Sequence, residues 1–121
     1  MPISVLVVED HAELRTVVKT LLERAGYEVH CAANPDEALE LLQRIPHPCI
    51  LLWDAMTPRR GLEMLDKATL EGVHIATLPV SIAAVPVAES ESPLMVKRLV
   101  SEDAILSIVQ EHCPLTTEAN A

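Results

Sequence analysis

Three acidic side chains follow two apolar segments that have the composition of buried strands. Residues 3–8 run into Glu9 and Asp10, and residues 49–53 run into Asp54. If these strands lie side by side and parallel, the three carboxylates meet at one edge of a sheet, where like charges repel and burial raises the cost. A divalent cation would resolve this conflict, and hard oxygen ligands suit Mg²⁺. The sequence therefore predicts a magnesium site at the edge of a sheet.

The composition limits the kind of protein that can carry this site. The chain has 121 residues, half of them apolar, which fits one domain with a real core. Its net charge of −9 argues against nucleic-acid binding, which needs a basic patch. No apolar run approaches the roughly 18 residues of a membrane span. The first residues lack the features of a signal peptide, so we expect a cytoplasmic protein without a membrane partner.

The three cysteines match no metal-binding or redox spacing. They are Cys31, Cys49 and Cys113, an odd number spread widely along the chain. Disulfides are rare in a reducing compartment, and buried cysteines behave as small apolar residues. We therefore expect all three to be small core or surface residues of a cytosolic protein.

Strands and helices alternate in the sequence pattern. We expect strands over residues 3–8, 27–32, 49–53, 80–84 and 94–96, because these segments are short and mostly apolar. Apolar residues at helical spacing predict helices after Asp10, after Asn34, from Gly61 to Gly72, and after Ser101. Gly26 stands where a left-handed helix cap belongs. This alternation indicates an α/β protein with a parallel sheet, whose functional sites lie at the carboxyl ends of the strands.

Three motifs, taken together, resemble the receiver domain of two-component response regulators. They are residues 5–10, residues 51–58 and the pair Val96-Lys97, and the resemblance covers about residues 3–112. It implies a flavodoxin-like (βα)5 three-layer sandwich with a five-stranded parallel sheet of order 2-1-3-4-5. We expect a receiver-like domain over residues 3–113 and a flexible tail over residues 114–121.

The resemblance also implies a role for each site residue. Asp54 matches the phosphoacceptor, a carboxylate nucleophile that forms an acyl phosphate. Asp10 and Glu9 match the acid pair that holds Mg²⁺, and the backbone carbonyl of Met56 matches a further ligand. Lys97 matches the lysine that pairs with Asp54 and then with the phosphoryl group. The implied partners are a histidine kinase or phosphotransfer protein, and a downstream signalling protein.

The output half of the chain departs from the family pattern. The family has Thr or Ser at the end of the fourth strand, where this sequence places Ala83 or Ala84 unless the register shifts toward Thr77 or Ser81. Only twelve residues separate Ala84 from Lys97, and prolines interrupt them, so we expect a degenerate fourth helix.

Two functions of different classes remain open, and neither is an enzyme. The first is a receiver that accepts a phosphoryl group at Asp54 with Mg²⁺ and has an atypical output face. The second is a pseudo-receiver that keeps the fold and acts as a phosphorylation-independent interaction module. A third interpretation, an unrelated Mg²⁺-dependent phosphotransfer enzyme, is poorly supported because the chain has no glycine-rich phosphate loop.

Overall fold

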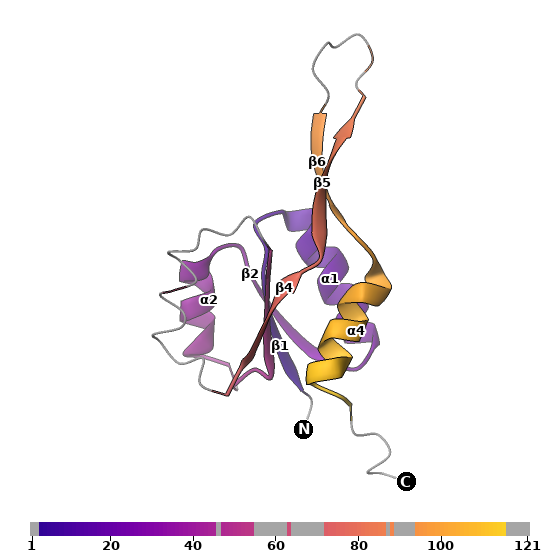
Figure 1. Cartoon of the computed structure of the whole chain (residues 1–121). Coiled ribbons are helices and arrows are strands. Elements are labelled where there is room, and N and C mark those ends of the chain that lie inside the picture. The colour runs from indigo at the N-terminus through magenta and orange to yellow at the C-terminus, as the bar shows by residue number, and fades with distance from the viewer. Residues whose placement is uncertain are drawn as a thin grey trace.

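A four-stranded parallel sheet forms the centre of the molecule (Figure 1). The computed structural model of the chain describes residues 3–45, 47–54, 63, 72–86, 88 and 94–115. The strand order in the sheet is β2-β1-β3-β4. Along the chain the elements are β1 (Ser4–Val8), α1 (Ala12–Arg24), β2 (Glu28–Ala32), α2 (Pro35–Leu42), β3 (Ile50–Asp54), β4 (His74–Leu78), β5 (Val80–Val85), β6 (Leu94–Leu99) and α4 (Glu102–His112).

Helices cover both faces of this sheet, with α2 on one side and α1 and α4 on the other (Figure 1). Alternate residues of β1 serve the two faces: Val5 and Val7 pack in the cluster with α1 and α4, while Leu6 and Val8 pack in the cluster that contains Ala38 of α2. Because both faces of a parallel strand are buried, its sequence is apolar without interruption. The α/β architecture and the predicted order of the first four strands, 2-1-3-4, are confirmed.

Local sequence explains where the helices begin. Asn34 caps α2, its Oδ1 accepting a hydrogen bond of 2.9 Å from the N–H of Glu37, and Pro35 occupies the first turn. Ser101 caps α4 in the same way, with its hydroxyl accepting from the N–H of Ala104 at 3.3 Å. Such caps satisfy N–H groups that have no partner within the helix. Gly26 follows α1 with a φ of +109°, which side chains other than glycine rarely adopt.

The predicted sheet differs from the structure in the residues of its fourth strand and in the place of its fifth. The fourth parallel strand is His74–Leu78, not residues 80–84, and its register sets Asp54 level with Leu78. The residues expected to form strands four and five instead pair with each other, β5 antiparallel to β6, in a separate two-stranded sheet. We call β5 and β6 the ribbon; it extends away from the body of the molecule (Figure 1). The backbone of an apolar strand can form hydrogen bonds with several neighbouring strands, and the sequence of the strand does not specify which neighbour it pairs with.

Two predicted helices fall mainly outside the described residues. The first is the helix expected over residues 61–72, of which the structure describes only residue 63 and Gly72. The other is the degenerate fourth helix: no helix occurs between β4 and α4 among the residues described there. Residues 116–121 of the predicted tail also lie outside. In the described part of the chain, no helix has both the length and the apolar character needed to cross a bilayer.

The three cysteines were expected to be small core or surface residues, but two of them are bonded to each other. Cys49 and Cys113 form a disulfide across 64 positions of sequence, while Cys31 is a partly buried free thiol. Spacing along the chain gave no indication of this pair, because the packing of α4 on the sheet brings the two residues together.

Candidate functional site

The ends of β1 and β3 place the three acids at one edge of the sheet. The two strands are parallel neighbours, and their register sets Val8 level with Trp53. Glu9 directly follows β1 and Asp54 is the last residue of β3, so the two acids stand next to each other at this edge. The N–H of Glu9 donates to the carbonyl of Ala32 at 3.0 Å, which continues the ladder one residue past β1. The parallel arrangement that was inferred from sequence therefore brings the acids to the carboxyl edge.

The three carboxylates lie close enough to share one ion. Oxygens of Glu9, Asp10 and Asp54 all lie within 4.8 Å of one another, and no other group of three or more candidate ligands is found among the described residues. Glu9 and Asp54 are buried, with 0% and 2% of the residue exposed, whereas Asp10 faces solvent. Two buried acids and one exposed acid make a site that opens to solvent on one side.

Lys97 from the ribbon brings a positive charge to the carboxylates of this site. Its Nζ lies 2.6 Å from Oδ1 of Asp10 and 2.8 Å from Oε1 of Glu9. The distance to Oδ1 of Asp54 is longer, 3.6 Å. The lysine that the sequence paired with Asp54 therefore stands closer to the other two acids. It bridges the end of β1 to β6, which lies outside the main sheet.

Burial and ion pairing shift the ionisation of these groups in opposite directions. Burial raises the pKa of Glu9, although its hydrogen bond from Lys97 works against that rise. The hydrogen bond from Lys97 lowers the pKa of Asp10. Burial by itself would lower the pKa of Lys97, but its hydrogen bonds to Asp10 and Glu9 outweigh this, and the net pKa is raised. Lys97 accordingly stays positively charged at neutral pH.

Glu9 is held on one oxygen and unpaired on the other. Its Oε1 accepts from Lys97 and, at 3.0 Å, from the backbone N–H of His11. Its Oε2 is buried and has no hydrogen-bond partner among the described residues. A buried carboxylate oxygen without a partner is costly, and a cation beside it would remove that cost. Three oxygen donors with an unsatisfied buried lone pair fit a hard divalent ion such as Mg²⁺.

Arg15 of α1 supports the site from outside the acid group. Its Nη1 donates to the backbone carbonyl of Glu9 at 2.9 Å and to that of Asp10 at 3.3 Å. Arg15 is not part of any of the three sequence motifs. Its position in the first turns of the helix that directly follows the two acids was the available clue. His11 caps α1, its Nδ1 accepting a hydrogen bond from the N–H of Leu14 at 3.4 Å.

Other predicted positions stand apart from the site or outside the described residues. Met56 lies outside, so its backbone carbonyl stays a prediction. Ala83 and Ala84 belong to β5 of the ribbon rather than to a strand beside β3, which corrects their predicted position. The residue level with Asp54 on β4 is Leu78, and Thr77 is level with Trp53. Even in the corrected register, the position level with Asp54 carries no hydroxyl.

Comparison with known proteins identifies one family. A sequence model of the response regulator receiver domain matches residues 5–105. The transcriptional regulatory protein SrrA of Staphylococcus aureus is 35% identical over 74 residues, which are 61% of this chain. Those residues are only 26% of SrrA, so this chain spans about a quarter of that relative's length.

Solved structures show the same fold. The chemotaxis response regulator CheY4 of Vibrio cholerae is 27% identical, with a TM-score of 0.55 over 64% of this chain and 68% of CheY4. A response regulator receiver domain protein from Bacillus halodurans is only 14% identical, but it matches 95% of this chain and 100% of its own with a TM-score of 0.66. These similarities confirm the flavodoxin-like α/β fold.

Proposed function

The chain belongs to the response regulator receiver domain family of two-component signalling, and we propose that it accepts a phosphoryl group on Asp54 with Mg²⁺ held by the neighbouring acids. The observation that carries this proposal is the meeting of Glu9, Asp10 and Asp54 within 4.8 Å, with the Lys97 ammonium among them. The function proposed is that of a signalling receiver rather than an enzyme. A cytoplasmic location, a histidine kinase or phosphotransfer protein as donor, and a downstream signalling protein as target belong to the same proposal.

Asp54 is proposed as the nucleophile. One of its carboxylate oxygens would attack the phosphorus of a phosphohistidine, the phosphorus–nitrogen bond would break, and the imidazole would leave with the electron pair. Burial of Asp54 would limit the access of water to the acyl bond that results. Glu9 and Asp10, which lie beside Asp54, are less suited to this role because Lys97 already binds both of them closely.

Lys97 would contribute positive charge during the transfer. It is 3.6 Å from Asp54, so a small movement of its flexible side chain would bring the ammonium to the incoming phosphoryl oxygens. Because its pKa is raised, it keeps its proton through the reaction. A fixed positive charge at the place where negative charge accumulates is an effective way to stabilise a transition state.

Glu9, Asp10 and Asp54 would hold the metal, and the backbone carbonyl of Met56 is a proposed fourth ligand. When bound, Mg²⁺ would supply the positive charge that offsets the carboxylates and the phosphoryl oxygens. The unpaired Oε2 of Glu9 supports this assignment, because Lys97 satisfies only the other oxygen of that carboxylate.

A second candidate is a pseudo-receiver that works by docking alone. Two observations favour it. Lys97 offsets part of the negative charge of the acid group, and Leu78 offers no hydroxyl level with Asp54 to report a phosphoryl group. In this alternative the acid group is a structural ion cluster, and the partner binds without regard to phosphorylation.

Trp53 provides a direct test, because it is the only tryptophan and precedes Asp54. Fluorescence should change when Mg²⁺ is added and change again with beryllofluoride, a phosphoryl analogue. A small acyl phosphate donor should add one phosphoryl group to the wild type and none to Asp54→Asn. The matched control is Asp36→Asn, which removes an exposed acid at the start of α2 and should leave both responses unchanged.

The outcomes separate the two candidates. Metal binding without any phosphoryl group gained would support the pseudo-receiver. No fluorescence response to Mg²⁺, and equal phosphorylation of the Asp54→Asn variant, would reject the proposed site as a whole.

A further inference from the structure

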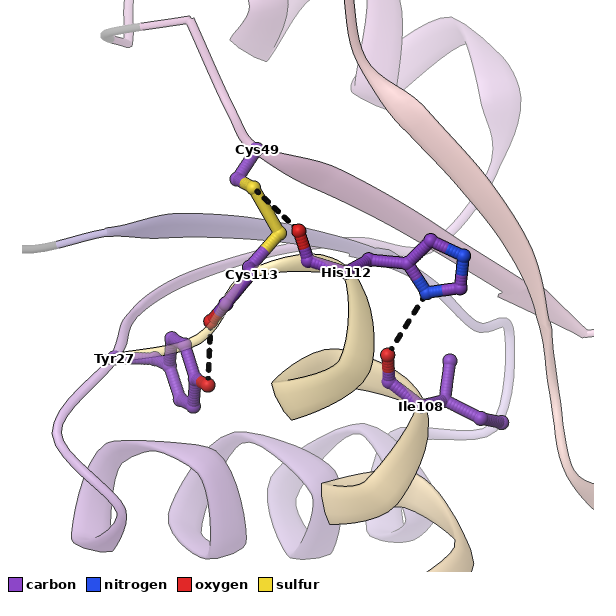
Figure 2. The surroundings of a disulfide bond; sticks show 5 residues. All are labelled: Tyr27, Cys49, Ile108, His112 and Cys113. Atoms are coloured by element: carbon purple, nitrogen blue, oxygen red, sulfur yellow. Dashed lines mark hydrogen bonds between the residues drawn. A yellow bond between two sulfur atoms is a disulfide. The ribbon is translucent and has the colours of Figure 1, made fainter. Parts of the chain in front are cut away.

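A disulfide fastens the last helix to the sheet at the edge opposite the acids. Cys49 precedes β3 directly, so it stands at the strand end remote from Asp54. Cys113 is the C-cap of α4. The bond joins them across 64 positions of sequence (Figure 2). The site proposed for phosphoryl transfer does not explain this pair.

The backbone holds Cys113 in place without help from the sulfur atoms. The Tyr27 hydroxyl donates to the carbonyl of Cys113 at 2.8 Å in a buried position, as Figure 2 shows. The N–H of Cys113 donates to the carbonyl of Val109 at 2.7 Å, which closes the last turn of α4. Val109 itself is completely buried in the core. Cys113 would therefore stay close to its present position if the disulfide were broken.

Cys49 is held equally well from the sheet. Its N–H donates to the carbonyl of Ser4, and its carbonyl accepts from the N–H of His74, both at 2.9 Å. The Cα atoms of Cys49 and Cys113 are 6.2 Å apart, within the range that a disulfide bridges. Hydrogen bonds that involve neither sulfur thus keep the two cysteines within bonding distance.

The surroundings also accommodate the reduced state. Sγ of Cys49 lies 3.8 Å from the carbonyl oxygen of His112, a contact drawn in Figure 2. A disulfide sulfur has no proton to donate to that oxygen, but a thiol does. Cys49 is partly exposed, whereas Cys113 is 2% exposed, so Cys49 is the residue of the pair that a reagent in solution meets first.

We propose that Cys49 and Cys113 form a reversible redox site, in which a low-molecular-weight thiol or disulfide sets whether α4 is covalently fastened to β3. Hydrogen bonds of the fold hold both cysteines in place in either state, and Cys49 is partly exposed. Disulfides seldom persist in a reducing cytoplasm, so in that compartment the pair would change with the redox poise rather than stay closed.

The chemistry is thiol–disulfide exchange. In reduction, an external thiolate attacks Sγ of Cys49, the protein disulfide breaks, and Cys113 leaves as a thiolate that takes up a proton. A second external thiolate then attacks the mixed disulfide and releases Cys49. Two external thiols become one disulfide, and two electrons and two protons are gained by the protein pair. Oxidation by a low-molecular-weight disulfide is the reverse sequence.

The bond has consequences for the segment between the two cysteines. That segment runs from β3 to α4 and contains both Asp54 and Lys97. Closing it removes conformational freedom from the opened chain, so oxidation should hold α4 more firmly on the sheet. The redox pair would work in this way whether or not Asp54 accepts a phosphoryl group.

Thiol counting tests the reversibility. The full chain would be equilibrated in glutathione buffers of different redox ratio, quenched by acid, unfolded and alkylated, and the added labels counted by mass. We expect one label under oxidising conditions and three under reducing conditions, with a reversible transition between them. The Cys31→Ser variant is the matched control and should carry no label under oxidising conditions and two labels under reducing conditions. Labelling of all three cysteines at every ratio would overturn the proposal.

Hydrogen exchange tests the consequence for α4. Amides of the last turns of α4 should exchange about tenfold faster in the reduced wild type than in the oxidised one, with α1 as internal reference. Cys49→Ser should match the reduced protein at every glutathione ratio. If that variant does not fold, the reduced wild type still provides the comparison. Equal exchange in α4 of the oxidised and reduced wild type would show that the bond does not control this helix, and would contradict the proposal.

Discussion

The ammonium group of Lys97 lies 2.8 Å from Oε1 of Glu9, a residue that is completely buried and stands 88 positions earlier in the chain. Few contacts described in this chain join residues so distant in sequence, and this one connects the ribbon to the end of β1. Removing one partner of a buried ion pair leaves the other charge without compensation. The pair is therefore expected to be important for stability as well as for the site.

Replacing Lys97 by methionine should destabilise the protein at neutral pH by about 3 kcal/mol, because Glu9 is left buried and uncompensated. The sign of the pH dependence follows from the raised pKa of Glu9. A carboxyl group whose folded pKa is raised adds stability at low pH and loses it as pH rises through that pKa. Urea unfolding at several pH values should therefore show a deficit in Lys97→Met that shrinks toward acidic pH.

The neighbouring Arg98→Met variant is the control, because Arg98 is exposed and lies outside the acid group. It should unfold like the wild type at all pH values. Added Mg²⁺ should restore part of the stability of Lys97→Met, since an ion beside Glu9 replaces the missing charge. A Lys97→Met protein as stable as the wild type at neutral pH, without metal, would show that the ion pair is dispensable.

Asp10→Asn should weaken Mg²⁺ binding about tenfold, because it removes a charged ligand from the site. Asp10 is the exposed member of the group, so folding should tolerate the change. The matched variant Glu13→Gln removes an exposed acid in the first turn of α1 and should bind Mg²⁺ as the wild type does. Trp53 fluorescence titrations would give both affinities, and equal affinities would exclude Asp10 as a ligand.

Tyr27 should make the protein sensitive to alkaline pH. Burial raises the pKa of this phenol above its ordinary value of 10.0, and its hydroxyl donates to the carbonyl of Cys113. Because the folded pKa is raised, the stabilisation is present below pH 10 and is lost as pH rises through the folded pKa.

Urea unfolding of the wild type and of Tyr27→Phe should be compared between pH 8 and pH 11 in the oxidised state. The phenylalanine variant should be less stable by about 1 kcal/mol at the lower pH, and the difference should shrink above pH 10. A difference that stays constant over this range would mean that the buried hydroxyl does not titrate with folding.

The conformational response to a phosphoryl analogue should be muted in the ribbon. Leu78 is level with Asp54 and has no hydroxyl that could bond differently in the two states, and a switch requires such a difference. Amide spectra with Mg²⁺, recorded with and without beryllofluoride, should show shifts around Asp54, Glu9 and Lys97 but only small ones along β5. Large shifts throughout residues 80–100 would demonstrate an intact switch.

The sequence by itself determined the features that depend only on residues close together along the chain. The acids at the ends of β1 and β3 could be predicted because each follows an unbroken apolar run, and such a run is buried on both faces of a parallel sheet. The caps at Asn34 and Ser101 were predictable for the same reason, since a cap bonds to an N–H only three residues later.

Only the tertiary structure decided which distant segments pair. The sequence around β4, β5 and β6 does not specify a pairing partner, so it did not reveal that Leu94–Leu99 would pair with β5 and leave the parallel sheet at four strands. The bond between Cys49 and Cys113, and the approach of Lys97 to Glu9 rather than to Asp54, have the same origin. The packing of whole helices and strands sets the distance between the residues of each pair. Residue type and spacing along the chain do not predict that distance directly.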